Sequence, residues 1–175
     1  LWHIMKIYAQ HGFTEFVLCL GYKSEFIKNY FLNYENMSND FTIELGSGNV
    51  DVHSSHDEQG WRVTLVDTGL NAMTGARLKR VEDQIDGDEF ILTYGDGVID
   101  MNIDDLIESH HASGKIGTVT GVSPRSHYGE LGISQDRVVS FREKPNSGDK
   151  FISGGYFVLN KDFFRYLVDE DDCVL

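Results

Sequence analysis

The stretch FILTYGDGVID, residues 90–100, is an apolar run that breaks abruptly into Tyr-Gly-Asp-Gly. A short, continuously apolar segment is typical of a strand that is buried on both faces of a parallel sheet. Asp96 follows between two glycines, and both an ordinary tight turn and a metal-binding carboxylate would use these residue types. The spacing leaves both interpretations open, so the neighbouring segments must decide the fold and the chemistry.

Strand-like and helix-like patterns alternate along the chain on both sides of this stretch. Continuous or β-branched apolar runs predict strands, whereas apolar residues three and four positions apart predict helices. We expect strands at residues 16–20, 41–45, 61–67, 89–94, 117–122, 137–145 and 151–160, and helices at residues 1–10, 24–31 (with Ser24 as its cap), 74–85, 103–114 and 161–168. Because strands joined by helices form βαβ units, the pattern predicts a single α/β domain over residues 1–175, with a mostly parallel sheet and helices on both faces.

Composition narrows the function classes. The chain has 28 Asp and Glu against 15 Lys and Arg, a formal net charge of −13. Such a surface repels nucleic acid and anionic membranes, so we expect neither as a partner.

Cys19 and Cys173 lie far apart without disulfide or metal-ligand spacing, which suits a reducing cytoplasm. No signal peptide or membrane-spanning run is visible, and the chain begins inside a helix pattern, so we expect either a fragment or a protein whose usual first element is missing.

Four segments follow expected strands, where ligands bind in α/β sheets: residues 21–23, 68–77, 94–100 and 143–155. In the second segment, Thr74 and Gly75 open a helix whose N–H groups suit an anion or a base edge. Arg77 offers a planar fork for phosphate or a pyrimidine. The alternative is a capped amphipathic helix that carries Arg77, Lys79 and Arg80 on its solvated face.

The fourth segment suits a sugar phosphate. Glu143 and Lys144 end an expected strand, and Gly154 and Gly155 lie inside the next one, where glycines weaken packing unless something must come close. The Lys ammonium would meet the phosphate, while Glu143 would accept hydrogen bonds from sugar hydroxyls. A surface Glu–Lys pair in a hairpin is the alternative.

Two histidine pairs are interpreted as solvated or capping residues rather than metal ligands. His110 and His111 are adjacent on an expected helix and cannot both face one ion. His53 and His56 lie in a polar loop that contains no cysteine.

Six segments together resemble the sugar-1-phosphate nucleotidylyltransferases. They are FVLCLGYKSEFIKNYF (16–31), VDTGLNAMTGARLKRV (66–81), FILTYGDGVID (90–100), GTVTGVSPRSHYGEL (117–131), FREKP (141–145) and FISGGYFVL (151–159), in the order found in that family. TGARLKRV and TYGDGV are most similar to the glucose-1-phosphate cytidylyltransferase branch, whereas EKP is shared more widely.

The resemblance implies a Rossmann-like sheet of the nucleotide-diphospho-sugar transferase type and an enzyme that transfers the cytidylyl group of CTP to glucose 1-phosphate. It implies Asp96 as the ligand of a catalytic Mg²⁺, with Arg77 and Lys144 as further catalytic residues. The implied nucleotide contacts are Thr74, Gly75, Arg77 and Gly95, and the implied sugar-phosphate contacts are Tyr94, Glu143, Lys144, Gly154 and Gly155. A homo-oligomer is a further expectation.

Departures from the family keep two alternatives open. The family begins with a strand and a glycine-rich loop that wraps the triphosphate, and it continues with a second metal-binding Asp, but this sequence matches neither segment. We therefore expect truncation at both ends. One alternative is a catalytically dead remnant that binds sugar phosphate or nucleotide or serves in assembly. The other is a uridylyl- or thymidylyltransferase of the same family.

Overall fold

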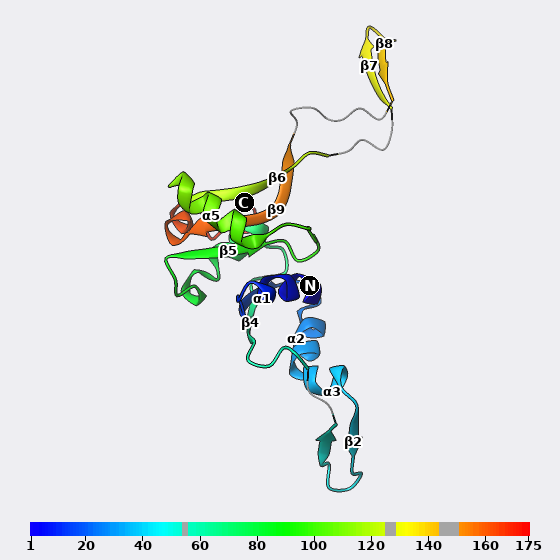
Figure 1. The fold of residues 1–175 in the computed structure, drawn as a ribbon, viewed down its shortest axis with the longest axis vertical. Helices are drawn as coiled ribbons and strands as arrows, with labels where there is room; N and C mark the ends of the chain where they lie inside the picture. The colour runs from blue at the N-terminus through cyan, green and yellow to red at the C-terminus, as the bar shows by residue number, and fades with distance from the viewer. Residues whose placement is uncertain (54–55, 125–128, 144–150) are drawn as a thin grey trace. The chain divides into compact units, whose positions relative to one another are not determined.

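The structure, a computed structural model, describes residues 1–53, 56–124, 129–143 and 151–175. These residues form two compact units (Figure 1). The terminal unit combines residue 2 with residues 4–87 and 161–175, and the middle unit combines residues 1 and 3 with residues 88–160. Each unit has its own strands and its own buried residues. The single domain expected from the sequence stays a prediction.

The terminal unit is built around a parallel pair of strands. Its elements are α1 (Trp2–Gln10), β1 (Glu15–Leu20), α2 (Ser24–Leu32), α3 (Tyr34–Ser38), β2 (Phe41–Ile43), β3 (Val50–Val52), β4 (Arg62–Asp67), α4 (Thr74–Lys79) and two 3₁₀ helices, η1 (Glu82–Gln84) and η2 (Lys161–Tyr166). β1 and β4 pair in parallel, from Glu15 opposite Arg62 to Leu20 opposite Asp67. β2 and β3 form a separate antiparallel hairpin.

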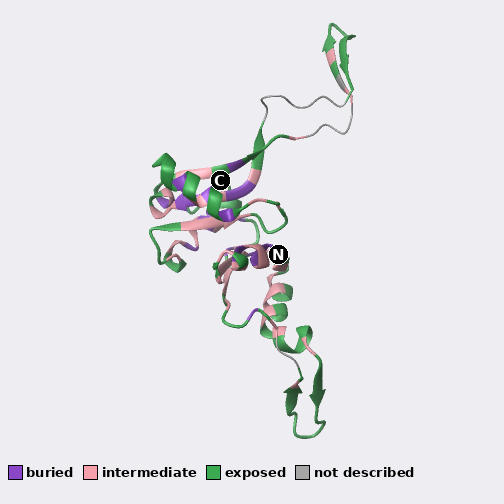
Figure 2. Cartoon of the chain, in the orientation of Figure 1, coloured by how far each residue is buried: buried purple, intermediate pink, exposed green. Residues whose placement is uncertain are grey.

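The core of the terminal unit begins with α1, whose apolar residues recur at helical spacing. Ile4, Met5 and Tyr8 are each at most 6% exposed. The helix ends before Gly12, whose φ of 86° lies in the left-handed region that favours glycine. The other buried apolar residues of this unit are Leu20, Ala72, Ala76, Leu78, Val81, Phe164 and Leu167 (Figure 2).

The helix expected at residues 161–168 is the 3₁₀ helix η2, and the boundaries of α2 and α4 also differ from the sequence expectation. Lys23, with a φ of 58°, is the N-cap of α2, so Ser24 is the first helical residue and not the cap. α4 ends at Lys79 instead of continuing to residue 85. The reason is that Val81 N–H donates to Leu78 O, three residues back, which tightens the chain into the 3₁₀ turn of η1.

The middle unit places one strand between two others. Its elements are β5 (Glu89–Thr93), α5 (Ile103–Ser113), β6 (Gly117–Val122), β7 (Glu130–Ser134), β8 (Arg137–Arg142) and β9 (Ile152–Asn160). β9 pairs antiparallel with β5 on one side and with β6 on the other. β5 and β6 consequently run parallel to each other, and α5 joins them as the expected crossover helix. The α/β class is confirmed. The expected sheet was mostly parallel, but among the described strands β1–β4 is the parallel pairing, and β2–β3, β5–β9, β6–β9 and β7–β8 are antiparallel.

The β7–β8 hairpin pairs only with itself among the strands that the structure describes. Leu131, Ile133 and Phe141 in this hairpin are each more than half exposed (Figure 2). Across the described ranges, the structure contains no helix with the length and apolar character needed to cross a membrane.

His110 corrects the interpretation of its histidine pair as solvated or capping. It is 3% exposed on the inner face of α5. Its Nε2 lies 2.8 Å from Asn160 Oδ1 at the end of β9, and its Nδ1 lies 2.9 Å from Thr118 Oγ1 on β6. The imidazole therefore links α5 to two strands. His111, in contrast, is exposed and pairs with Glu89 at 2.9 Å.

Candidate functional site

The turn after β5 carries Asp96, and β9 holds this turn at both ends. Tyr94 N–H donates to Gly155 O at 3.2 Å. Tyr156 Oη donates to Gly97 O at 2.9 Å. The Asp96 carboxylate is exposed between these two anchors. A fixed turn with an exposed carboxylate is suited to holding a cation at a defined place.

The glycines beside Asp96 leave space above the turn. A Cβ at Gly95 or Gly97 would meet no atom within 4 Å. Neither glycine has a positive φ, so the turn does not use the left-handed backbone that glycine permits. The open space agrees with a close approach by a ligand, and the roles of Asp96 and Gly95 remain predictions.

Gly154 and Gly155 lie in a β-bulge of β9, next to the Asp96 turn. The register of β9 against β6 shifts between Val119 and Gly121. Gly155 has a φ of 77°, and a Cβ there would lie 3.0 Å from Tyr94 Cδ2. A Cβ at Gly154 would lie 2.5 Å from Thr120 Oγ1 on β6. The chain's own side chains therefore account for both glycines, and their contact with a sugar phosphate remains a prediction.

Of the predicted Glu143–Lys144 pair, the structure describes Glu143. Glu143 follows β8 and is exposed, and its Oε2 lies 3.3 Å from the place that a Cβ on Gly129 would take. Lys144 lies outside the described residues. The described contacts of Glu143 are within its own hairpin, and they do not bring it together with Tyr94 or Gly155.

The start of α4 is covered by residues near the end of the chain. Gly75 N–H and Ala76 N–H both donate to Cys173 O, at 3.0 and 3.1 Å. Leu175 N–H donates to Thr74 Oγ1 at 3.0 Å. A Cβ at Gly75 would lie 2.7 Å from Cys173 Sγ, which explains why this position is glycine. The nucleotide contacts predicted for Thr74 and Gly75 remain predictions.

Arg77 is half-buried, which contradicts the alternative that places it on a solvated face. Its Nη1 donates to Leu20 O at 3.0 Å and to Thr68 Oγ1 at 2.9 Å. A Cβ at Gly21 would lie 2.5 Å from the same Nη1, so the guanidinium uses the space left by this glycine. Cys19 Sγ lies 3.7 Å from Arg77 O, and burial raises the pKa of this thiol to about 11 despite the nearby guanidinium.

Thr68 is the centre of this network, and sequence reasoning missed it. The residue is 1% exposed, and its N–H and hydroxyl both donate to Leu20 O. Arg80 Nη1 donates to Thr68 O at 2.7 Å. The same guanidinium pairs with Asp169 at 2.6 Å and with Asp171 at 2.9 Å. Only the position of Thr68 directly after an apolar strand could have suggested its role.

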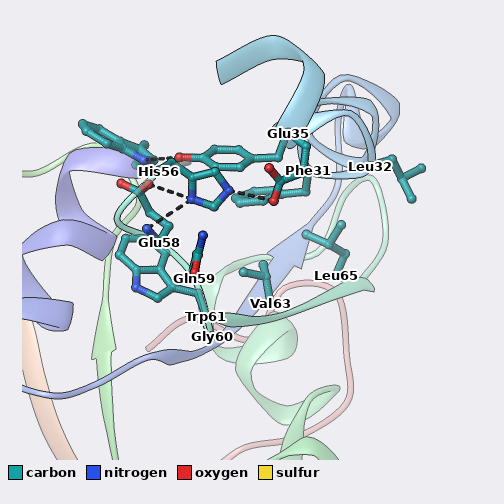
Figure 3. A pocket seen from close by; sticks show the side chains of 12 residues that line it. Phe31, Leu32, Glu35, His56, Glu58, Gln59, Gly60, Trp61, Val63 and Leu65 are labelled. Atoms are coloured by element: carbon teal, nitrogen blue, oxygen red, sulfur yellow. Dashed lines mark hydrogen bonds and ion pairs between the residues drawn. The ribbon is translucent and has the colours of Figure 1, made fainter. Parts of the chain in front are cut away.

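A pocket of about 400 Å³ in the terminal unit contains His56, which the sequence interpretation set aside as solvated or capping (Figure 3). Its Nε2 lies 2.7 Å from Glu35 Oε1, and its Nδ1 accepts from Glu58 N–H at 3.2 Å. Glu58 is 8% exposed and pairs with Lys6 at 2.9 Å. Burial raises the pKa of Glu58, but the hydrogen bonds and charges of Lys6, the backbone N–H and His56 outweigh it, so the pKa lies below its ordinary value.

No group of three or more His, Cys, Asp or Glu side chains with metal-ligating geometry occurs among the residues that the structure describes. This finding does not decide the magnesium prediction, because Mg²⁺ is commonly bound by one or two carboxylates, with substrate phosphates and water completing its shell.

Comparisons with known proteins agree with the fold and the motifs. The model of a family described as nucleotidyl transferase matches residues 1–173. The chain is 46% identical over 172 residues to "Glucose-1-phosphate cytidylyltransferase" of Salmonella typhi, covering 98% of this chain and 66% of that protein. It is 41% identical over 167 residues to "Probable glucose-1-phosphate cytidylyltransferase" of Bacillus subtilis, covering 95% of this chain and 65% of that protein. The chain thus spans about two thirds of the length of these relatives.

A solved structure shares the fold. HddC from Yersinia pseudotuberculosis, complexed with GMP-PN, superposes with a TM-score of 0.65 at 20% identity, over 99% of this chain and 67% of that chain. This likeness confirms the Rossmann-like α/β fold and carries nothing about ligands. The family rests on the sequence match over nearly the whole chain. The chain belongs to the nucleotidyl transferase family.

Proposed function

We propose that the protein transfers the cytidylyl group of CTP to glucose 1-phosphate, giving CDP-glucose and pyrophosphate. The observation that carries this proposal is the 46% identity, over 98% of the chain, to an enzyme named for that activity. An oxygen of the sugar phosphate attacks the α-phosphorus of CTP, and pyrophosphate leaves with the electrons of the broken P–O bond. Such transfers depend mainly on positioning the reactants and on stabilising negative charge.

The Asp96 turn is the proposed metal-binding element. The exposed carboxylate and the open space over Gly95 and Gly97 fit a magnesium ion that takes most of its remaining ligands from substrate phosphates and water. A bound Mg²⁺ would neutralise charge on the transferred phosphoryl group. Tyr94 N–H and Tyr156 Oη keep the carboxylate in place through their bonds at the two ends of the turn.

The proposed nucleotide-binding residues lie on and beside α4. Thr68 Oγ1 and Leu20 O fix the orientation of the Arg77 guanidinium, so this side chain loses little conformational freedom when it meets an anionic or pyrimidine ligand. Glu143 and Lys144 stay the proposed sugar-phosphate contacts. The proposed partners of the protein are CTP and glucose 1-phosphate.

A pyrophosphate-release assay with CTP, glucose 1-phosphate and Mg²⁺ tests this function, and the Salmonella typhi relative is the positive control. Turnover should depend on Mg²⁺ and should exceed that with UTP or dTTP at equal concentration. Asp96→Asn should lower turnover by at least ~100-fold, whereas Asp100→Asn, an exposed carboxylate four residues away, should leave it near wild type.

Calorimetry separates the enzyme from a catalytically dead remnant. Binding of CTP or glucose 1-phosphate without any pyrophosphate release would contradict the proposed activity and favour the remnant. A faster reaction with UTP or dTTP than with CTP would contradict the cytidylyl assignment and retain the family.

A further inference from the structure

Four large aromatic side chains line the pocket of the terminal unit, together with aliphatic and polar residues (Figure 3). Trp2 comes from α1, Phe31 from α2, Tyr34 from α3, and Trp61 precedes β4. The cavity volume of about 400 Å³ lies within the ~300–1,000 Å³ range of small-molecule sites. None of the residues assigned above to CTP or glucose 1-phosphate lines it.

The aromatic walls hold one another in place. Tyr34 Oη accepts a hydrogen bond from Trp2 Nε1 at 2.9 Å. The Tyr34 ring lies nearly parallel to Phe31, with centroids 6.3 Å apart, and edge-on to the His56 ring at 5.0 Å. These contacts orient the ring faces before any ligand arrives, which lowers the entropy cost of binding.

The polar groups of the pocket are mainly acidic. Glu35 and Glu58 belong to the lining, and Lys6 balances one of them through its 2.9 Å pair with Glu58. The His56 ring lies between the two carboxylates, with Nε2 2.7 Å from Glu35 Oε1 and Nδ1 3.2 Å from Glu58 Oε2. The exposed Asp57, 3.8 Å from Lys6 Nζ, is a third carboxylate beside the pocket.

The side-chain ammonium of Lys6 already lies beside an aromatic ring and a carboxylate of this pocket. Lys6 Nζ lies 5.0 Å from the centroid of the Trp2 ring and 2.9 Å from Glu58 Oε1. Aromatic faces and carboxylates both stabilise cations, and the attraction is greater where water is partly excluded. The pocket wall thus offers both an aromatic face and a carboxylate, the two kinds of contact that stabilise an organic cation.

We propose that this pocket binds a small organic cation, in which a protonated or quaternary nitrogen is attached to an apolar or aromatic body. The aromatic rings contact the body and the face of the cation, and the exposed carboxylate of Glu35 meets its charge. CTP and glucose 1-phosphate are anions, which the same carboxylates repel. The proposal is therefore independent of the proposed transferase activity.

The two tryptophans of the chain make the test direct, because Trp2 and Trp61 are its only tryptophans and both line the pocket. We would titrate the full 175-residue chain with benzyltrimethylammonium, benzyl alcohol and phenylacetate, following tryptophan fluorescence and the two indole N–H resonances. The expected result is saturable binding of the cation, at least ~10-fold tighter than the neutral alcohol, and no saturation with the anion.

Matched variants locate the site. Glu35→Gln should weaken binding of the cation by ~5-fold, and Glu25→Gln, an exposed carboxylate on α2 outside the lining, should leave it unchanged. Trp61→Phe keeps an aromatic wall and should retain binding by calorimetry. Matching circular dichroism spectra would show that the variants are folded. Equal affinity for benzyl alcohol, equal effects of the two Glu substitutions, or a linear response without saturation would each overturn the proposal.

Discussion

Replacing Thr68 by Val tests the hydrogen-bond network between β1, β4 and α4. Thr68 Oγ1 accepts from Arg77 Nη1 at 2.9 Å and donates to Leu20 O at 2.8 Å. Valine fills nearly the same volume but removes both bonds. Leu20 O keeps two other donors, Thr68 N–H at 2.9 Å and Arg77 Nη1 at 3.0 Å, so no buried acceptor loses its last partner.

The expected loss follows from these two bonds. A hydrogen bond to a charged donor contributes ~1.5–3 kcal/mol and a neutral one ~1 kcal/mol, so Thr68→Val should lower the free energy of unfolding by ~2–4 kcal/mol. Thr68→Ser keeps the hydroxyl and removes one buried methyl, which should cost ~1 kcal/mol. The order of the two variants distinguishes the network from simple side-chain burial.

Urea denaturation followed by circular dichroism measures both losses. A double-mutant cycle with Arg77→Met should give a coupling energy of ~1–2 kcal/mol between the two side chains. The reasoning is refuted if Thr68→Val lies within ~0.5 kcal/mol of wild type, if Thr68→Ser is the more damaging change, or if the coupling energy is zero.

Three further predictions concern single positions, each measured by chemical denaturation. Gly155→Ala should cost at least ~1–2 kcal/mol because of its φ of 77°, whereas Gly97→Ala, with open space around it, should cost little, and equal losses would contradict the steric argument. His110→Leu should cost ~2–4 kcal/mol by leaving polar groups of β6 and β9 without their partner, while His111→Leu, at an exposed position, should stay within ~0.5 kcal/mol. The pKa of Glu58 is lowered in the folded state, so its ionised carboxylate stabilises the fold. The difference in free energy of unfolding between wild type and Glu58→Gln should therefore be largest above the ordinary pKa of 4.5 and should disappear as the pH falls through the folded-state pKa. A difference that does not change with pH would contradict the pairing.

The sequence predicted a helix or strand well where the residues of that one segment are enough to determine it. The apolar run of β5 and the spacing of Ile103, Leu106 and His110 in α5 are properties of single segments, and both elements lie where expected. The antiparallel direction of β9 differs from the mostly parallel sheet that we expected, because direction depends on pairing with β5 and β6, which are distant in sequence. The early end of α4 depends on a switch to three-residue hydrogen bonding that periodicity does not show.

The sequence predicted where the candidate site residues lie along the chain, but it did not predict which other residues they contact. Asp96 lies directly after a strand, as the sequence predicted, but its turn is fixed by Tyr156, 59 residues from the carbonyl that it binds. Arg77 was identified as a possible ligand, and its partners Leu20 and Thr68 come from the ends of two other elements. The hydrogen bond from Glu58 N–H to His56 agrees with the capping interpretation, but the contact of His56 with Glu35, 21 residues away, could not be predicted from neighbouring sequence.

The attachment of residues 161–175 to the terminal unit has a consequence for synthesis of the protein. Arg80 binds Asp169 and Asp171, which lie 89 and 91 residues further along the chain, and Thr74 binds Leu175 across 101 residues. A ribosome adding ~5–20 residues per second synthesises all of residues 88–160 before it adds these partners. The described strands of the middle unit are therefore all synthesised before the residues that hold the first turn of α4, which follow that helix by ~5–20 seconds.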